Sequence, residues 1–104
     1  MPAKTDPMLP GEQAEKIATT LKALAHPMRL QIVALLEGRE MTVGEIVEAL
    51  GAKHSITSQQ LGLMKDRGVL ACRREGMYSY YRIHNPRVLK LLGCVREKRE
   101  TEEN

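Results

Sequence analysis

The chain has 104 residues, of which 42 % are hydrophobic and 28 % charged, and its formal net charge is +3. This length allows one small domain, which buries only about 60–70 % of its unfolded surface and would gain stability from pairing with a second copy. No stretch approaches the ~18 apolar residues that span a bilayer, no secretory signal is visible, and two cysteines do not indicate a disulfide framework, so we expect a cytoplasmic protein.

Two helices are predicted in the first third of the chain. Residues 1–11 contain three prolines and no apolar periodicity, so we expect a flexible arm. Small and apolar residues recur at helical spacing over residues 12–25 and predict a helix with one apolar stripe. His26 and Pro27 end this helix and begin a second one, which continues to Gly38.

Two shorter helices follow. Thr42 and Glu45 have the spacing of a capping box, in which each side chain binds the other residue's backbone N–H, and this third helix is expected to end at Gly51. A fourth helix starts between Lys53 and Ser55 and ends at Gly68.

A hairpin and a last helix complete the predicted elements. Residues 69–82 form two extended stretches, with Glu75-Gly76 at the tip because glycine tolerates positive φ. Asn85-Pro86 is typical of a helix start and leads a final helix that reaches Arg99. Residues 100–104 are expected to form a charged tail.

Helix, turn, helix and then hairpin is the order of a winged helix-turn-helix. The predicted fold is therefore mainly α with a small β-hairpin, and residues 12–99 form one DNA-binding and dimerisation domain. Residues 51–90 carry eight Lys and Arg against two acidic residues, a local net charge of +6. Phosphate binding requires such a concentration of charge, although a solvated basic face is the alternative.

The second helix of this motif is sized to enter the DNA major groove. If Thr57, Leu61 and Met64 point inward, the other face offers Gln59 to adenine and Ile56 to a thymine methyl, while lysines bind phosphates. The predicted DNA-binding residues on this helix and the wing are Lys53, His54, Ser55, Ile56, Ser58, Gln59, Lys65, Arg73 and Arg74.

The outer helices carry apolar stripes that the helix-turn-helix does not use. We expect these stripes to pack against a second copy, although they could instead close the core of a single chain. The residues predicted at the dimer interface are Ile17, Leu21, Leu24, Val88, Leu91, Leu92 and Val95.

Four blocks of sequence, at residues 21–30, 42–46, 58–64 and 73–83, together resemble the ArsR/SmtB family of bacterial repressors. The resemblance covers residues 21–92. It implies five helices with the wing before the last one, a homodimer formed by the outer helices, and a repressor that an inducer releases from its promoter. One departure is the Ile56-Thr57 pair, which replaces the usual polar-then-apolar order and leaves open which residue faces inward.

The resemblance also allows a check of known sensor sites. The positions of family metal ligands carry residues unsuited to Zn²⁺, namely Thr42, Gly44, Asn85, Arg87, Lys98 and Thr101. The two thiols of persulfide-responsive relatives fall near Ala34 and Glu100, again without cysteine. We therefore predict no metal and no cofactor.

Cys72 and Cys94 do not fit these sites. Free cysteines usually behave as small, partly buried hydrophobic residues. The alternative is a relocated thiol sensor, with Arg73 favouring the Cys72 thiolate. His26, His54 and His84 share no ligand spacing and are expected to be helix caps or surface residues.

No phosphate-binding glycine loop or nucleophile with a base is visible, so no enzyme is predicted. We expect a cytoplasmic homodimeric repressor that binds an imperfect inverted repeat in double-stranded DNA. One alternative is a winged-helix dimer that acts as a protein-interaction module without DNA. Another is a regulator that binds DNA but senses nothing. The sequence identifies neither the inducer nor the operator.

Overall fold

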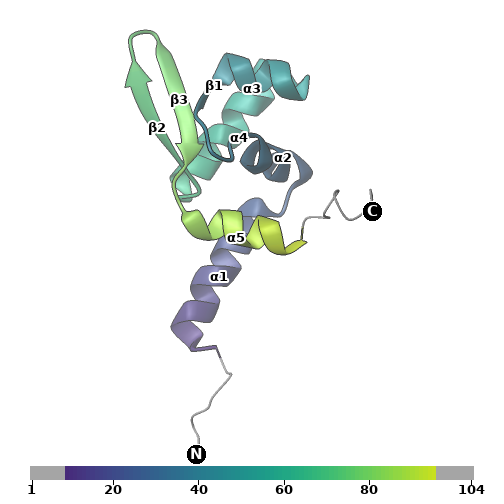
Figure 1. Cartoon of the computed structure of the whole chain (residues 1–104), viewed down its shortest axis with the longest axis vertical. Helices are drawn as coiled ribbons and strands as arrows, with labels where there is room; N and C mark the ends of the chain where they lie inside the picture. Colours follow the sequence, from purple (N-terminus) through teal and green to yellow (C-terminus); the bar gives the residue numbers. More distant parts are fainter. Residues whose placement is uncertain (1–8, 96–104) are drawn as a thin grey trace, which may run out of the picture.

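The computed structural model describes residues 9–95, with the backbone alone for Cys94 and Val95. Five helices and one three-stranded sheet make up this part of the chain (Figure 1). Their order is α1 (Gly11–Leu24), α2 (Pro27–Leu35), β1 (Met41–Thr42), α3 (Val43–Leu50), α4 (His54–Asp66), β2 (Leu70–Glu75), β3 (Tyr78–Ile83) and α5 (Pro86–Val95). The predicted mainly α winged helix-turn-helix is confirmed.

The predicted starts of α2 and α3 carry side-chain caps. His26 accepts the backbone N–H of Met28 on Nδ1 at 3.1 Å, ahead of Pro27 at the first position of α2. The capping box of α3 is present: the Glu45 N–H donates to the Thr42 hydroxyl at 3.2 Å, and the Thr42 N–H donates to the Glu45 carboxylate at 2.9 Å. These local bonds satisfy N–H groups that have no partner within the helix.

Several boundaries differ from the predictions. α1 begins at Gly11, inside the predicted arm, and ends at Leu24. α2 ends at Leu35 rather than near Gly38, because Leu36 already leaves helical geometry as its C-cap. The predicted end of the last helix at Arg99 and the tail 100–104 lie outside the described residues.

The sequence analysis missed strand β1. Met41 and Thr42 pair antiparallel with Tyr81 and Tyr80 of β3, which gives the strand order β1-β3-β2. Two residues are too few to show an alternating pattern, and Thr42 also serves as the cap of α3. This short strand joins the hairpin to the helix-turn-helix.

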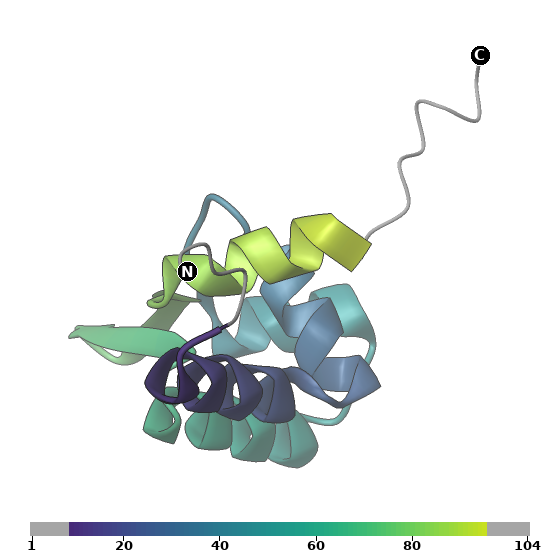
Figure 2. The same cartoon turned by 90° about the horizontal axis from the view of Figure 1, so that it is seen from below.

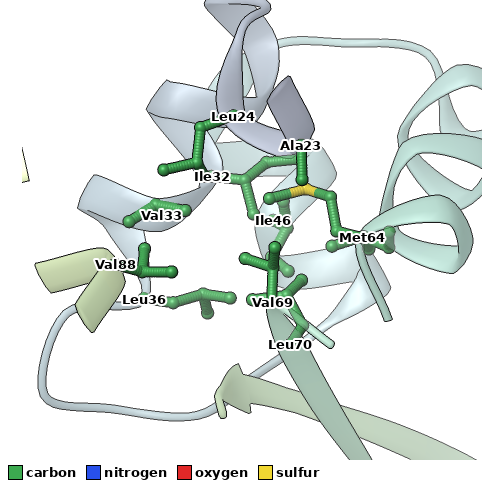
Figure 3. Packing of buried hydrophobic residues seen from close by; sticks show 11 residues of the cluster. Ala23, Leu24, Ile32, Val33, Leu36, Ile46, Met64, Val69, Leu70 and Val88 are labelled. Carbon is green, nitrogen blue, oxygen red and sulfur yellow. The ribbon is translucent and has the colours of Figure 1, made fainter. Parts of the chain in front are cut away.

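The core lies where the helices meet the base of the hairpin (Figure 3). The buried hydrophobic residues are Ala23, Leu24, Ile32, Val33, Leu36, Ile46, Leu61, Met64, Val69, Leu70 and Val88. Burying a side chain of this kind stabilises the fold by about 1.5–3 kcal/mol. Leu24 and Val88, two of the predicted interface residues, are only 4 % and 0 % exposed, so their side chains are already largely covered within one chain.

The hairpin β2-β3 projects from the helical body, whereas α1 extends away from the body at the other end (Figure 1). Seen from below, the hairpin leaves the body on one side, as a thin blade (Figure 2). Within residues 9–95, none of the helices has the combined length and hydropathy of a membrane span.

Candidate nucleic-acid interface

The inner face of α4 is fixed by three side chains without solvent exposure, Thr57, Leu61 and Met64. The Thr57 hydroxyl donates to the Lys53 carbonyl at 2.8 Å, so its burial leaves no unpaired hydroxyl. Ile56 is 45 % exposed. Of the Ile56-Thr57 pair, the threonine therefore faces the core and the isoleucine faces solvent.

The outer face of α4, together with its N-cap residue Lys53, holds the seven predicted DNA-contacting residues of this segment on the surface. The exposed residues are Lys53, His54, Ser55, Ile56, Ser58, Gln59 and Lys65. The face offers hydroxyl and amide groups, one apolar side chain, and a positive charge near each end, which suits base edges flanked by phosphates.

The N-terminus of α4 adds a feature that the sequence did not reveal. Lys53 occupies the N-cap position, and no described side chain caps the first turn. Backbone N–H groups at such an end carry a partial positive charge and bind anions. The start of α4 therefore presents a partial positive charge to an anion, beside Lys53.

Gln60, which no prediction included, connects α4 to the helices behind it. The Arg29 Nε donates to the Gln60 amide oxygen at 2.8 Å, and the Arg29 Nη1 donates to the Ala23 carbonyl at 3.4 Å. Arg29 belongs to α2 and Ala23 to α1. The recognition helix is thus tied to the end of α1 by a side-chain bridge.

The wing consists of β2 and β3, paired over six residues on each strand, with Gly76 at φ 62° in the turn. Both predicted arginines are exposed, but their surroundings differ. Arg73 pairs with Tyr80 and lies over its ring, 4.6 Å from the centroid, whereas Arg74 pairs with Ser79. Neighbouring residues of a strand point to opposite faces, so the two guanidinium groups leave the hairpin on different sides.

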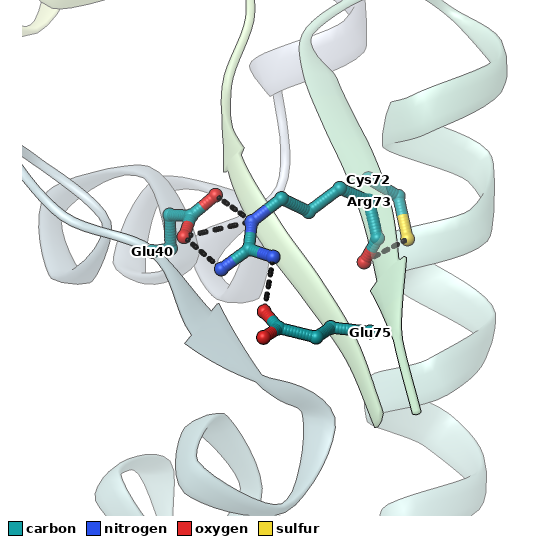
Figure 4. A network of polar contacts seen from close by, with 4 residues as sticks. All are labelled: Glu40, Cys72, Arg73 and Glu75. Atoms are coloured by element: carbon teal, nitrogen blue, oxygen red, sulfur yellow. Dashed lines mark hydrogen bonds and ion pairs between the residues drawn. The ribbon is translucent and has the colours of Figure 1, made fainter. Parts of the chain in front are cut away.

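Carboxylates already bind the guanidinium group of Arg73 (Figure 4). Its Nε lies 2.9 Å from Glu40 Oε2, its Nη2 lies 2.9 Å from Glu40 Oε1, and its Nη1 donates to Glu75. The hydrogen bond from Arg73 holds the pKa of the Glu40 carboxyl below its ordinary value. Glu40 and Glu75 raise the pKa of Arg73 in turn. The sequence prediction did not include this network.

Cys72 is half-buried on β2, opposite Tyr81. Its thiol faces the Arg73 carbonyl oxygen at 4.0 Å, and Figure 4 shows it pointing away from the guanidinium group. Burial, with a contribution from Cys72, raises the pKa of Tyr81. Arg73 points to the other face and binds carboxylates, so its guanidinium group does not lie against the Cys72 thiol as the sequence analysis expected. The side chain of Cys94 lies outside the described part.

An apolar groove of about 380 Å³ lies among α1, α2 and α5. Leu21 and Leu30 are 48 % and 40 % exposed at its edge. Half-buried Ile17 and Leu91 line a neighbouring hollow. The groove is lined by Leu21, Leu24, Ala25, Leu30, Val33, Leu91 and Leu92. It thus brings together predicted interface residues from both outer helices and adds Leu30 from α2, which the sequence analysis missed.

The histidines are not assembled into a site. His26 caps α2, His54 is the exposed first residue of α4, and His84 follows β3, where its backbone N–H donates to the Val69 carbonyl. Among residues 9–95, no group of three or more His, Cys, Asp or Glu side chains is placed to hold a metal ion.

Comparisons with known proteins agree with this geometry. Residues 26–71 match the model of the arsR family of bacterial regulatory proteins. A helix-turn-helix transcriptional regulator of Mycobacterium tuberculosis is 41 % identical over 81 residues, which cover 77 % of this chain and 71 % of that protein. The structure of the transcriptional repressor BigR from Xylella fastidiosa superposes with a TM-score of 0.76 at 32 % identity, covering 81 % and 86 % of the two chains. The repressor PagR of Bacillus anthracis gives 0.73 at 36 % identity, covering 82 % and 98 %.

Proposed function

The chain belongs to the ArsR family of bacterial regulatory proteins, and we propose that it is a homodimeric repressor that binds an operator and releases it when an inducer binds. The observation that carries the proposal is the exposed polar face of α4, oriented by buried Thr57, Leu61 and Met64, beside a projecting wing. The matched relatives are named as regulators or repressors, and we propose no catalytic role. A regulator of transcription acts at the chromosome, so we place it in the cytoplasm.

The proposed contacts on α4 divide into two kinds. Gln59 and Ile56 read base edges in the major groove, through adenine and a thymine methyl, with Ser55 and Ser58 beside them. Lys53, His54 and Lys65 lie at the flanks and bind phosphates, which raises affinity without specifying sequence. Arg74 extends this phosphate contact to the wing.

We propose that the apolar groove among α1, α2 and α5 is the centre of the dimer interface. It exposes Leu21 and Leu30, and burying these apolar side chains against the same groove of a second chain would stabilise a dimer. A two-fold dimer would place one α4 in each of two successive major grooves, about 34–36 Å apart. An imperfect inverted repeat is the matching operator.

Release would follow from a change in the dimer geometry. An inducer that binds more tightly to a dimer with another spacing of its two α4 helices shifts the population toward that form. The Arg29 bridge supports such coupling, since it connects α4 to the end of α1, next to the proposed interface.

Selection of bound fragments from genomic DNA, followed by fluorescence anisotropy with the selected duplex, tests the proposal. The selected duplex should bind at least about a thousandfold more tightly than a shuffled duplex of equal length at physiological salt. Equal, weak binding of both duplexes would contradict the proposal and favour a winged-helix dimer that acts only on other proteins.

A further inference from the structure

We propose that Arg73 is a positioning residue that holds the wing at a fixed angle to the helix-turn-helix, and that it does not bind DNA phosphate. The inference rests on the proposed DNA-binding function and deepens it. It gives a different role to Arg73, one of the two wing arginines that the sequence analysis predicted to bind DNA.

The contacts of Arg73 span the whole sheet. Glu40 directly precedes β1 at one edge of the sheet, and Arg73 belongs to β2 at the other edge. The Arg73 side chain crosses the central strand over the Tyr80 ring and reaches both Glu40 oxygens (Figure 4). Residues 33 positions apart in sequence are thereby joined across three strands.

The contact of Arg73 with Glu40, called the strap below, reinforces the short pairing between β1 and β3. β1 has two residues, so only Met41 and Thr42 pair with the wing at this edge. The same Thr42 caps α3, and α3 packs on α4. A two-residue ladder alone constrains the angle between the wing and α4 only weakly. A second attachment at Glu40 therefore limits the range of that angle.

The electrostatics of the strap disfavour a phosphate at Arg73. All three guanidinium nitrogens donate to carboxylate oxygens, and one face of the group is covered by Tyr80. Glu40 and Glu75 offset the charge of Arg73, and with Arg82, which also acts on Glu40, the group has no net positive charge to attract a phosphate. An approaching phosphate would meet two like charges.

Replacing Glu40 by Gln separates positioning from charge, because the two ideas predict opposite signs. Removing a carboxylate near DNA should strengthen binding if charge alone matters. If the strap positions the wing, Glu40→Gln should weaken binding to the selected operator about fivefold, the upper range for an exposed ion pair. Glu48→Gln removes an exposed carboxylate of α3 outside the network and serves as the matched control, with affinity unchanged or slightly raised.

The salt dependence of binding distinguishes the two wing arginines. Arg74→Gln should reduce the slope of log K against log salt by about 0.9 for each phosphate that the variant no longer neutralises. Arg73→Gln should lower affinity and leave that slope nearly unchanged. An unchanged or raised affinity of Glu40→Gln, or an equal reduction of slope by both arginine variants, would overturn the inference.

Hydrogen exchange of the free protein provides a readout that does not need DNA. Glu40→Gln should speed exchange of the amides of Met41 and Tyr81, which face each other where β1 pairs with β3. Unaltered exchange would refute a positioning role even if no operator were found. Failure of the wild-type chain to bind any duplex would instead contradict the proposed function.

Discussion

Thr57 decides which face of α4 meets the solvent. It is fully buried, and its hydroxyl is satisfied by the carbonyl one turn earlier, while its neighbour Ile56 is 45 % exposed. Apolar character alone would have turned the isoleucine inward. The compact threonine fits the core here, and the isoleucine lies on the surface, where a ligand of α4 can contact it.

Exchanging these two residue types one at a time tests the orientation. Thr57→Ile adds volume to a packed site and should lower the free energy of unfolding by about 1–3 kcal/mol. Ile56→Thr lies on the surface and should change it by less than about 0.5 kcal/mol. Urea denaturation measures both, and a larger loss for Ile56→Thr would mean that the helix is turned the other way.

The Glu40 carboxylate should make stability depend on pH in a defined direction. Its pKa is lower in the folded chain than its ordinary value, because Arg73 binds the charged form. This contribution is present above the ordinary carboxyl pKa of about 4.3 and is lost as pH falls through the lower folded value. The excess stability of wild type over Glu40→Gln should therefore be constant above about pH 5 and shrink below pH 4 in urea titrations. An excess that grows on acidification would contradict the ion pair.

At the scale of elements, local chemistry made most of the fold predictable. The His26-Pro27 and Thr42-Glu45 signals act through bonds within a few residues, so they mark helix starts without tertiary information. β1 could not be predicted, because its identity depends on pairing with Tyr80 and Tyr81 some 40 residues later. The Glu40–Arg73 contact and the Arg29–Gln60 bridge were missed for the same reason: they join segments that only the fold brings together.

The capping box should be measurable on its own. Thr42→Ala leaves the Glu45 N–H without its hydroxyl acceptor and should cost about 1 kcal/mol of unfolding free energy. Thr19→Ala is the control, since that hydroxyl only donates to the Glu15 carbonyl of its own exposed helix. Equal effects of the two variants in chemical denaturation would argue against the cap.

At the scale of the molecule, the apolar groove and the wing lie on different parts of the chain. The groove lies among α1, α2 and α5, whereas the wing and the polar face of α4 belong to the other elements. Pairing through the groove would leave both DNA-contacting elements uncovered. The assembly state and DNA binding can therefore be tested by separate variants.

Leu21→Glu and Leu30→Glu should dissociate the proposed dimer, because each places a charge on the apolar groove. Sedimentation at micromolar concentration should give twice the 11.7 kDa of one chain for wild type and the single mass for the variants. Met77→Glu, at an 89 % exposed position of the wing tip, is the control and should stay dimeric. A wild-type mass of one chain would refute the dimer.

The salt dependence of operator binding is the most direct test of the central claim that cationic groups around α4 and the wing grip DNA. Anisotropy titrations with the selected duplex should show log K falling steeply and linearly with log salt for wild type. A variant with Lys53, Lys65 and Arg74 all changed to Gln should bind more weakly and with a shallower slope, by about 0.9 for each phosphate left without its cation. An affinity that does not change with salt concentration would show that these side chains do not contact DNA phosphates. A neutralised variant with the wild-type slope of log K against log salt would show the same.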